Sequence, residues 1–200
     1  VRVSFADPIK ELEFIQANVP DELIRIKLGP IVHELITKNG DYVDVGIKRV
    51  EIKEWLLSVF IKYPKMPGEK NRPLLQNLGH EARKKFGDRI WIDYALRQAR
   101  KYNNVVIDDV RYENEANTLK GEGFNLWRVE ITPDEQMRRL RELYGEDMLK
   151  RTTHQSEVDL DNRWDIFDYI IDNNGSLEEL YLSATRILKE EGQCLQRPTG

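Results

Sequence analysis

The sequence predicts an α/β protein with three layers, in which a parallel sheet is covered by helices on both faces. Three short apolar runs, "NNVVID", "FNLWRVEI" and "FDYIID", have the length and residue types of strands. Each run is followed by a segment with helical periodicity. Strands that alternate with helices at this spacing are typical of a parallel sheet. A fourth alternating run, "VRVSF", opens the chain and predicts one more strand.

The expected helices carry recognisable start signals. In "ADPIKELEFI", Asp7 stands near the start and Pro8 lies in the first turn, where proline is tolerated. The stretches "TPDE" and "SLEE" have the pattern of capping boxes and predict helix starts at Thr132 and Ser176. Helical periodicity between residues 21 and 63, interrupted by a turn, predicts an inserted helical subregion. The loop "YPKMPGEKNRP" then leads into helices over "PLLQNLGHEARKKFG" and "RIWIDYALRQARKY".

Length and composition predict one compact domain over residues 1–200. The chain has 200 residues, of which 40% are hydrophobic and 33% charged, with a formal net charge of -4. It holds one cysteine, so no internal disulfide can form, and the three histidines lack cysteine neighbours at the spacing of a zinc site. Neither a signal peptide nor an apolar run of about 18 residues occurs. We therefore expect a cytoplasmic protein without membrane association.

Positive charge is concentrated in one segment. Residues 62–101 contain eleven Lys or Arg against four Asp or Glu, a local balance of +7, which leaves -11 for the rest of the chain. Such a segment in an acidic protein indicates an anionic ligand, although a solvated helix face explains the same count. A DNA-binding protein is a further interpretation of this segment, and salt-dependent DNA binding is its test.

Charged residues follow the strand expected in "VVIDDVRYENEA". In open parallel sheets, ligands bind at the carboxyl ends of the strands, which is where Asp108, Asp109 and Arg111 would lie. Arg111 could make a bidentate contact to a phosphate, or only an ion pair with a nearby carboxylate. Asp108 and Asp109 could hold Mg²⁺ through water, or one of them could accept a sugar hydroxyl, and for one of the two helix capping or exposure to solvent is the structural alternative.

Two other segments suit a nucleotide. In "NRPLLQNLGHE", Arg72 would suit a phosphate and Gln76 a base edge, since an amide offers both a donor and an acceptor. An exposed arginine and a helix-surface glutamine are the alternative. We expect Trp91 to be either a core residue or a side chain on which a nucleotide base stacks. The segment "MRRLRELYGEDMLKR" predicts either a solvated helix face or a lid that closes over phosphates.

Six blocks of the sequence, taken in order, resemble the phage deoxynucleoside monophosphate kinase family. These blocks are "RVSFADPIKE", "RPLLQNLGHE", "IWIDYAL", "VVIDDVRYENEA", "HQSEVDL" and "FDYIIDNNGSLEEL". The strongest is "DVRYENEA", which is similar to the family pattern Asp-Val-Arg-Phe-x-Asn-Glu. The resemblance covers nearly the whole chain and implies a P-loop kinase fold, with a helical monophosphate-binding region at 21–87 and a lid-like segment at 133–157.

The resemblance also implies an activity and a set of site residues. The reaction would move the terminal phosphate of ATP, with Mg²⁺, to a deoxynucleoside monophosphate (dNMP), in the host cytoplasm if the chain is phage-encoded. No long nucleic acid is implied, and a homodimer is a possible assembly. Matched to the blocks, the acceptor-binding residues would be Ser4, Arg72, Gln76, Trp91, Arg111, Asn114 and Glu115. Asp109, Arg139 and Arg151 would serve catalysis, and Asn173 and Gly175 would approach the adenine of ATP.

One departure from the family concerns the phosphates of ATP. Members of the family place a glycine-rich loop ending in Gly-Lys before the strand that matches "VRVSF", and no such motif occurs in the 200 residues. Either this chain lacks a loop that the natural protein has, or the protein binds nucleotides without phosphorylating them. The start at Val1, directly in a strand and without Met, favours the first interpretation. A second departure is His80, where the family tends to have a small hydroxyl residue.

Overall fold

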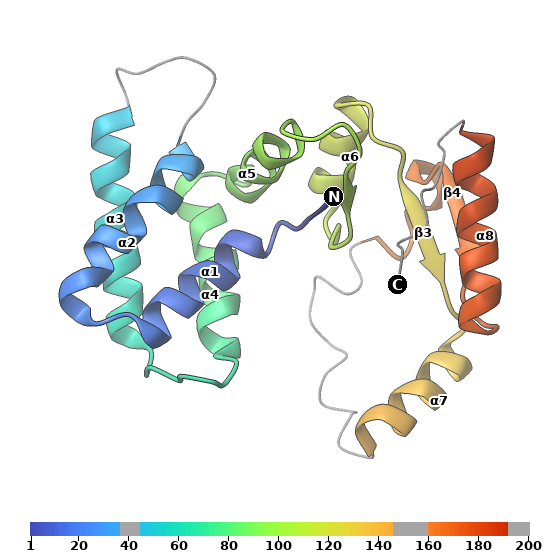
Figure 1. Ribbon diagram of the computed structural model, residues 1–200, viewed down its shortest axis with the longest axis horizontal. Helices are drawn as coiled ribbons and strands as arrows, with labels where there is room; N and C mark the ends of the chain where they lie inside the picture. Colours follow the sequence, from blue (N-terminus) through green and yellow to red (C-terminus); the bar gives the residue numbers. More distant parts are fainter. Residues whose placement is uncertain (37–44, 146–159, 192–200) are drawn as a thin grey trace. The chain divides into compact units, whose positions relative to one another are not determined.

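The structure is a computed structural model that describes residues 1–36, 45–145 and 160–191. Helices dominate, and two pairs of short parallel strands accompany them (Figure 1). The prediction of an α/β protein with parallel strands is therefore confirmed. The chain divides into two compact units, residues 1–110 and 111–200, which are described separately. Because compact units can belong to one domain, the single domain over residues 1–200 stays a prediction.

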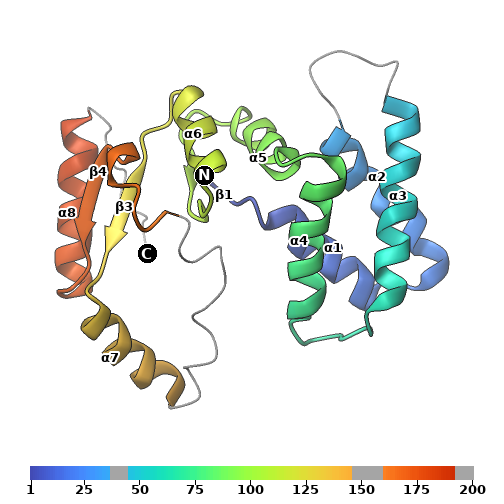
Figure 2. The same cartoon turned by 180° about the vertical axis from the view of Figure 1, so that it is seen from behind.

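In its described residues, 1–36 and 45–110, the first unit joins one strand pair to five helices. Strand β1 (Arg2–Val3) pairs in parallel with β2 (Val106–Ile107), and Arg2 lies opposite Val106. Figure 2 shows β1 leading directly into α1. The helices of this unit are α1 (Asp7–Asn18), α2 (Asp21–Ile36), α3 (Val45–Lys62), α4 (Arg72–Phe86) and α5 (Ile90–Ala99).

Leucines from four helices form the core of the first unit. Helix α2 packs on α1, α3 and α5, and α4 packs on α1, α3 and α5. Each fully buried leucine stabilises the folded chain by about 1.5–3 kcal/mol relative to exposure. These leucines are Leu12, Leu28, Leu56, Leu74 and Leu78. The predicted helical subregion is thus a packed bundle, and α4 has one buried and one exposed face.

Two buried amide side chains fix the loop before α4. Asn71 is only 2% exposed, and its Oδ1 accepts a hydrogen bond from the N–H of Leu74 (3.1 Å) while its Nδ2 donates to the carbonyl of Pro64 (3.0 Å). Gln16 of α1 donates from Nε2 to the carbonyl of Tyr63 (2.9 Å). An amide both donates and accepts, so it can satisfy backbone groups that no helix pairs. These contacts set where α4 begins, and hence where Arg72 lies.

The second unit contains the other strand pair. Strand β3 (Trp127–Glu130) pairs in parallel with β4 (Tyr169–Asp172), with Trp127 opposite Tyr169 and their rings in edge contact. Helix α8 packs on β4. The remaining elements are α6 (Glu113–Gly121), α7 (Pro133–Tyr144), a short 3-10 helix (Trp164–Ile166) and α8 (Leu177–Glu190). The lid-like segment predicted at 133–157 therefore begins with α7, and residues 146–157 lie outside the described residues.

The two predicted capping boxes differ in outcome. At α8, the hydroxyl of Ser176 accepts from the N–H of Glu179 and the Glu179 carboxylate accepts from the N–H of Ser176, as predicted. At α7, Thr132 accepts from the N–H of Glu135, but the Glu135 carboxylate binds Arg138 and Arg139 instead. Two guanidinium groups are stronger partners for a carboxylate than one backbone N–H. Across the described ranges, no helix is long and apolar enough to span a bilayer.

Candidate functional site

Asp109 connects the end of β2 to the chain that follows β1. Its carboxylate accepts hydrogen bonds from the Ser4 hydroxyl (2.5 Å), the N–H of Phe5 (2.9 Å) and the N–H of Ala6 (3.0 Å). Ser4 is fully buried. Parallel pairing brings the carboxyl ends of β1 and β2 side by side, which is why these residues meet. We call Ser4 and Asp109 together the strand-end clamp.

Neighbouring charges complete the polar surroundings of the strand-end clamp. The Asp7 carboxylate accepts from the N–H of Ser4 (2.9 Å), and Arg2 donates from Nε to Asp108 (2.6 Å). The Asp108 carboxylate raises the pKa of Arg2 further above its ordinary value. An ionised carboxylate offers about four acceptor positions. Among the described residues three donors bind Asp109, which leaves one acceptor position for a water or a ligand hydroxyl.

Arg72 and Gln76 lie on one exposed face of α4. They are four residues apart, which places them one above the other on a helix. Both side chains are exposed, and within the described residues neither has a hydrogen-bond or ion-pair partner. The structure therefore leaves both residues available to a ligand, although exposure alone does not show that one binds.

Trp91 and Glu115 are both buried and have partners within the protein. Trp91 is fully buried in the first unit, and its indole N–H donates to the carbonyl of Gly79 (3.1 Å). In the second unit Glu115 is 1% exposed, and its Oε2 accepts from the N–H groups of Arg111 (2.8 Å) and Tyr112 (3.1 Å) at the start of α6. These contacts give the two residues structural roles that account for their burial.

Arg111 and Asn114 lie at the start of the second unit, and both are exposed. The Asn114 carbonyl accepts from the hydroxyl of Thr118 (2.7 Å), which is a contact within α6. Arg72 and the strand-end clamp belong to the first unit. The assignment of Arg111 to the phosphate of a nucleotide therefore stays a prediction.

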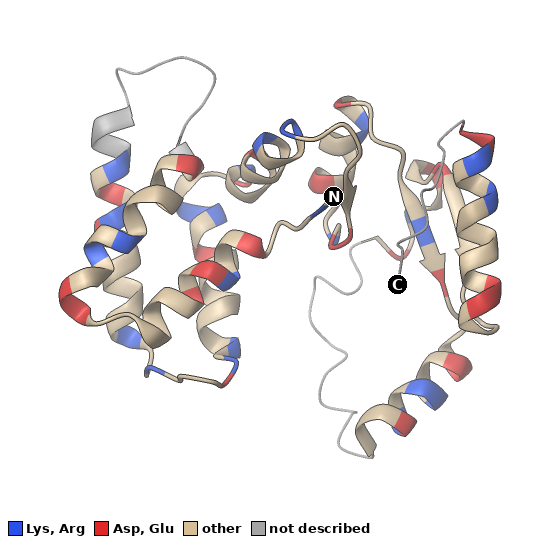
Figure 3. Ribbon diagram, viewed as in Figure 1, with Lys and Arg blue, Asp and Glu red and all other residues tan. Residues whose placement is uncertain are grey.

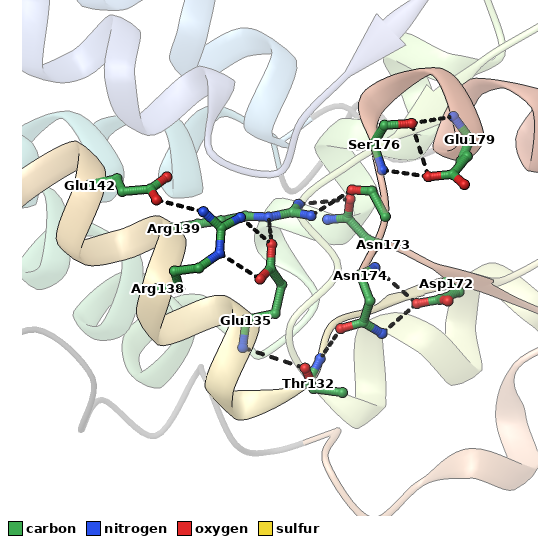
Figure 4. Close-up of polar contacts among 11 residues, drawn as sticks. Thr132, Glu135, Arg138, Arg139, Glu142, Asp172, Asn173, Asn174, Ser176 and Glu179 are labelled. Carbon is green, nitrogen blue, oxygen red and sulfur yellow. Dashed lines mark hydrogen bonds and ion pairs between the residues drawn. The ribbon is translucent and has the colours of Figure 1, made fainter.

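Arg139, Asn173 and Gly175 come together in the second unit. Arg139 donates from Nε to Glu135 (2.7 Å), from Nη1 to the side-chain oxygen of Asn173 (3.1 Å) and from Nη2 to the carbonyl of Gly175 (2.8 Å) (Figure 4). An arginine has five N–H donors, so each of its three nitrogens uses one here. Arg139 thus ties α7 to the turn between β4 and α8. Arg151, the other predicted lid arginine, lies outside the described residues.

Asn174 fastens the same turn to the end of β3. Its side-chain oxygen accepts from the N–H of Thr132 (2.7 Å), and its own N–H donates to Asp172 (2.9 Å) (Figure 4). Hydrogen bonds from Arg138 and then Arg139 lower the pKa of Glu135 to about 2. The sequence did not single out Asn174 or Glu135 as site residues. The motif "DNNG" marked the turn, but it did not show which asparagine would contact which loop.

A second polar cluster, also missed from the sequence, joins α2 to α5. Arg97 donates from Nη2 to the carbonyl of Glu34, and Gln98 donates from Nε2 to the Glu34 carboxylate (2.9 Å). Burial lowers the pKa of Arg97. Burial, followed by the charges of Glu11, Glu34 and Asp7, raises the pKa of Tyr94 to about 12. The helical periodicity of α5 showed an apolar face but not which polar residues border it.

The charged side chains are distributed over both units, with acidic and basic residues mixed on most helices (Figure 3). Part of the +7 balance of residues 62–101 is neutralised by carboxylates outside that segment, in the ion pairs of Lys65 with Asp21 (2.7 Å) and of Lys101 with Glu34 (3.8 Å). Among the described residues, no three His, Cys, Asp or Glu side chains gather to hold a metal ion.

Comparison of the chain with protein-family models, with curated proteins and with solved structures gave no match in any of the three.

Proposed function

We propose that this chain carries the acceptor-binding part of a nucleotide kinase, which transfers a phosphate from ATP to a deoxynucleoside monophosphate. The observation that carries the proposal is the contact between Ser4 and Asp109. These residues come from two blocks of the resemblance that are 105 residues apart, and they meet at the carboxyl ends of two parallel strands. Ligands of parallel sheets bind at such ends.

In the proposed reaction, a phosphate oxygen of the dNMP attacks the terminal phosphorus of ATP. A new P–O bond forms, the bond to ADP breaks, and no side chain becomes a covalent intermediate. The protein then contributes position and charge. Within the first unit, Arg72 would contact an anionic oxygen of the dNMP, and Gln76 its base. The one acceptor position left on Asp109 would take a sugar hydroxyl or a Mg²⁺-bound water.

The family that the chain resembles binds the phosphates of ATP with a glycine-rich loop. Phosphate-binding loops use consecutive backbone N–H groups and a lysine, and the motif is absent from the sequence. Phosphate transfer would need a loop from residues outside these 200.

The three-layer sheet of the proposed fold also needs a further strand. Within the described residues each sheet has only two strands, and Val106 of β2 and Val129 of β3 are 65% and 54% exposed. Isolated strand pairs are marginally stable, and purely parallel sheets are normally covered on both faces. A parallel strand that carries the glycine-rich loop would therefore fit this fold and supply the missing donors together.

A non-catalytic nucleotide-binding domain is the second candidate function. It is favoured by the same absence of a glycine-rich loop. Calorimetric titration of the chain with a mixture of dNMPs, and separately with ATP, tests whether it binds nucleotides at all. A chain that binds neither dNMPs nor ATP would contradict both candidate functions. We expect dNMP binding by the 200-residue chain without tight ATP binding. Addition of a strand and a glycine-rich loop should then confer ATP binding and phosphate transfer only if the kinase proposal is correct.

Arg111→Ala tests the assignment of the phosphate contact. A hydrogen bond to a charged group contributes about 1.5–3 kcal/mol, so dNMP affinity should fall by roughly 10- to 150-fold. Circular dichroism should stay unchanged because Arg111 is exposed. Arg25→Ala is the matched control, since Arg25 is an exposed arginine paired with Glu54 in the helical bundle. Normal dNMP binding by Arg111→Ala would show that the assignment is wrong.

A further inference from the structure

The turn between β4 and α8 contains an asparagine followed directly by a glycine, Asn174 and Gly175. In such a pair the backbone nitrogen of the glycine can attack the side-chain carbonyl carbon of the asparagine, because glycine has no side chain that hinders the approach. Both residues are exposed, so water can reach them. The Gly175 N–H has no hydrogen-bond partner among the described residues, which leaves its nitrogen available as the nucleophile.

Hydrogen bonds hold the Asn174 side chain at both of its polar atoms (Figure 4). The N–H of Thr132 donates to Oδ1 (2.7 Å), and Nδ2 donates to the Asp172 carboxylate (2.5 Å). Attack on the carbonyl carbon puts negative charge on Oδ1, and the departure of ammonia puts positive charge on Nδ2. The N–H of Thr132 and the carboxylate of Asp172 therefore lie where they stabilise these two developing charges, as the donors of an oxyanion hole do.

The fold also keeps glycine at position 175. A Cβ at this position would clash with the carboxylate of Glu179. That carboxylate accepts hydrogen bonds from the N–H (2.7 Å) and the hydroxyl (2.9 Å) of Ser176, in the capping box that starts α8. A larger residue, which would slow the attack on Asn174, cannot replace Gly175 without disturbing the start of α8.

From these contacts we infer that Asn174 is a site of self-catalysed deamidation. A bond forms between the Gly175 nitrogen and Cγ of Asn174, the Cγ–Nδ2 bond breaks, and the proton of the Gly175 N–H leaves with Nδ2 as ammonia. Water then opens the resulting succinimide ring and gives aspartate or isoaspartate at position 174. The inference is independent of the proposed function, because the reaction needs only the chain and water.

The product should loosen the attachment of the turn. A carboxylate oxygen would stand where Nδ2 lies now, 2.5 Å from the Asp172 carboxylate, and like charges at this distance repel each other. In isoaspartate the main chain runs through the side-chain carbons, which displaces Gly175 and the carbonyl that accepts from Arg139. Deamidation would thus act as a slow, irreversible change in how the turn is joined to β3 and α7.

Peptide mapping by mass spectrometry at neutral pH measures the conversion of Asn174. The rate is compared between the folded chain and the same chain unfolded in urea, where Thr132 and Asp172 no longer hold the amide. We expect Asn174 to deamidate about 5- to 10-fold faster in the folded chain. An equal or slower rate in the folded chain would overturn the inference.

Thr132→Pro tests the contact to Oδ1, because proline lacks the N–H and the φ of Thr132, -66°, is one that proline adopts. Thr132→Ala is the matched control, since it also loses the hydroxyl that caps α7 but keeps the N–H. We expect Thr132→Pro to deamidate at Asn174 about 5- to 10-fold more slowly than Thr132→Ala. Equal rates in the two variants would overturn the role of the fold in the reaction.

The sequence contains one other Asn-Gly pair, Asn39–Gly40, which lies outside the described residues. Its rate should be the same in both Thr132 variants, which separates a local effect at Asn174 from a general one. Asn174→Asp reproduces one product directly, and native-state hydrogen exchange at residues 173–176 should become faster in it. Asn103→Asp adds the same charge at an exposed position of the first unit and should leave that exchange unchanged. Wild-type exchange at residues 173–176 in Asn174→Asp would overturn the loosening of the turn.

Discussion

The carboxylate of Asp109 accepts a hydrogen bond from the hydroxyl of Ser4, across 105 residues of sequence, with the two oxygens 2.5 Å apart. Two backbone N–H groups, those of Phe5 and Ala6, bind the same carboxylate. Asp109 therefore holds the turn between β1 and α1 against the end of β2. It stabilises the first unit whether or not it also contacts a ligand.

Asp109→Ala should destabilise the first unit. The change removes three hydrogen bonds to a charged acceptor and leaves the hydroxyl of Ser4 buried without this partner. Loss of such a group costs about 2–4 kcal/mol. Urea unfolding monitored by circular dichroism measures the effect. Asp108→Ala is the control, because its ion pair with Arg2 is half-exposed and should contribute less than about 1 kcal/mol. Equal stability losses for the two variants would show that the clamp is not structural.

Arg139→Ala should loosen the turn between β4 and α8. Arg139 is the side chain that joins α7 to Asn173 and Gly175. Native-state hydrogen exchange should become faster at residues 173–176 and in the first turn of α7, because local opening costs less free energy there. In Arg138→Ala only the contacts within α7 are lost, to Glu135 and Glu142. Exchange at residues 173–176 should therefore stay at the wild-type rate in that variant.

Glu135 should remain ionised in acid well below the range of an ordinary glutamate. Hydrogen bonds from Arg138 and Arg139 lower its pKa to about 2. A lowered pKa in the folded state means that the stabilising contribution is fully present above the ordinary glutamate pKa and is lost as the pH falls toward 2. A carboxyl carbon titration by NMR measures this. Arg138→Ala should raise the midpoint toward the ordinary value, and an unchanged midpoint would contradict the assigned contacts.

Tyr94 should resist ionisation in mild alkali. Burial, and then the nearby carboxylates of Glu11, Glu34 and Asp7, raise the pKa of Tyr94 to about 12. Because the pKa of Tyr94 is higher in the folded chain than in the unfolded chain, the free energy of unfolding should be unaffected by this group below pH 10. It should then fall as the pH rises from 10 toward 12. The tyrosinate absorbance of the chain minus that of Tyr94→Phe isolates this group. A difference titration with a midpoint near 10 would show that Tyr94 is solvated like an ordinary tyrosine.

Local signals in the sequence located most of the elements. Proline in the first turn placed the start of α1, and the Ser176 capping box placed the start of α8, because both depend on residues within one turn of each other. The same reasoning was incomplete at α7, where Glu135 binds two arginines from the following turn. A capping motif shows that a carboxylate can reach the backbone N–H at the helix start. It does not show whether nearby arginines bind that carboxylate instead.

By itself, the sequence determined which segments form helices and strands, that the strands pair in parallel, and that charge follows the strand ending near Asp109. Only the tertiary structure decided that Asp109 binds Ser4, that Trp91 and Glu115 are buried, and that Arg139 contacts Asn173 and Gly175. The physical reason is the range of the interactions. Helices and turns form from contacts between residues a few positions apart, whereas a site depends on side chains that packing brings together from distant parts of the chain.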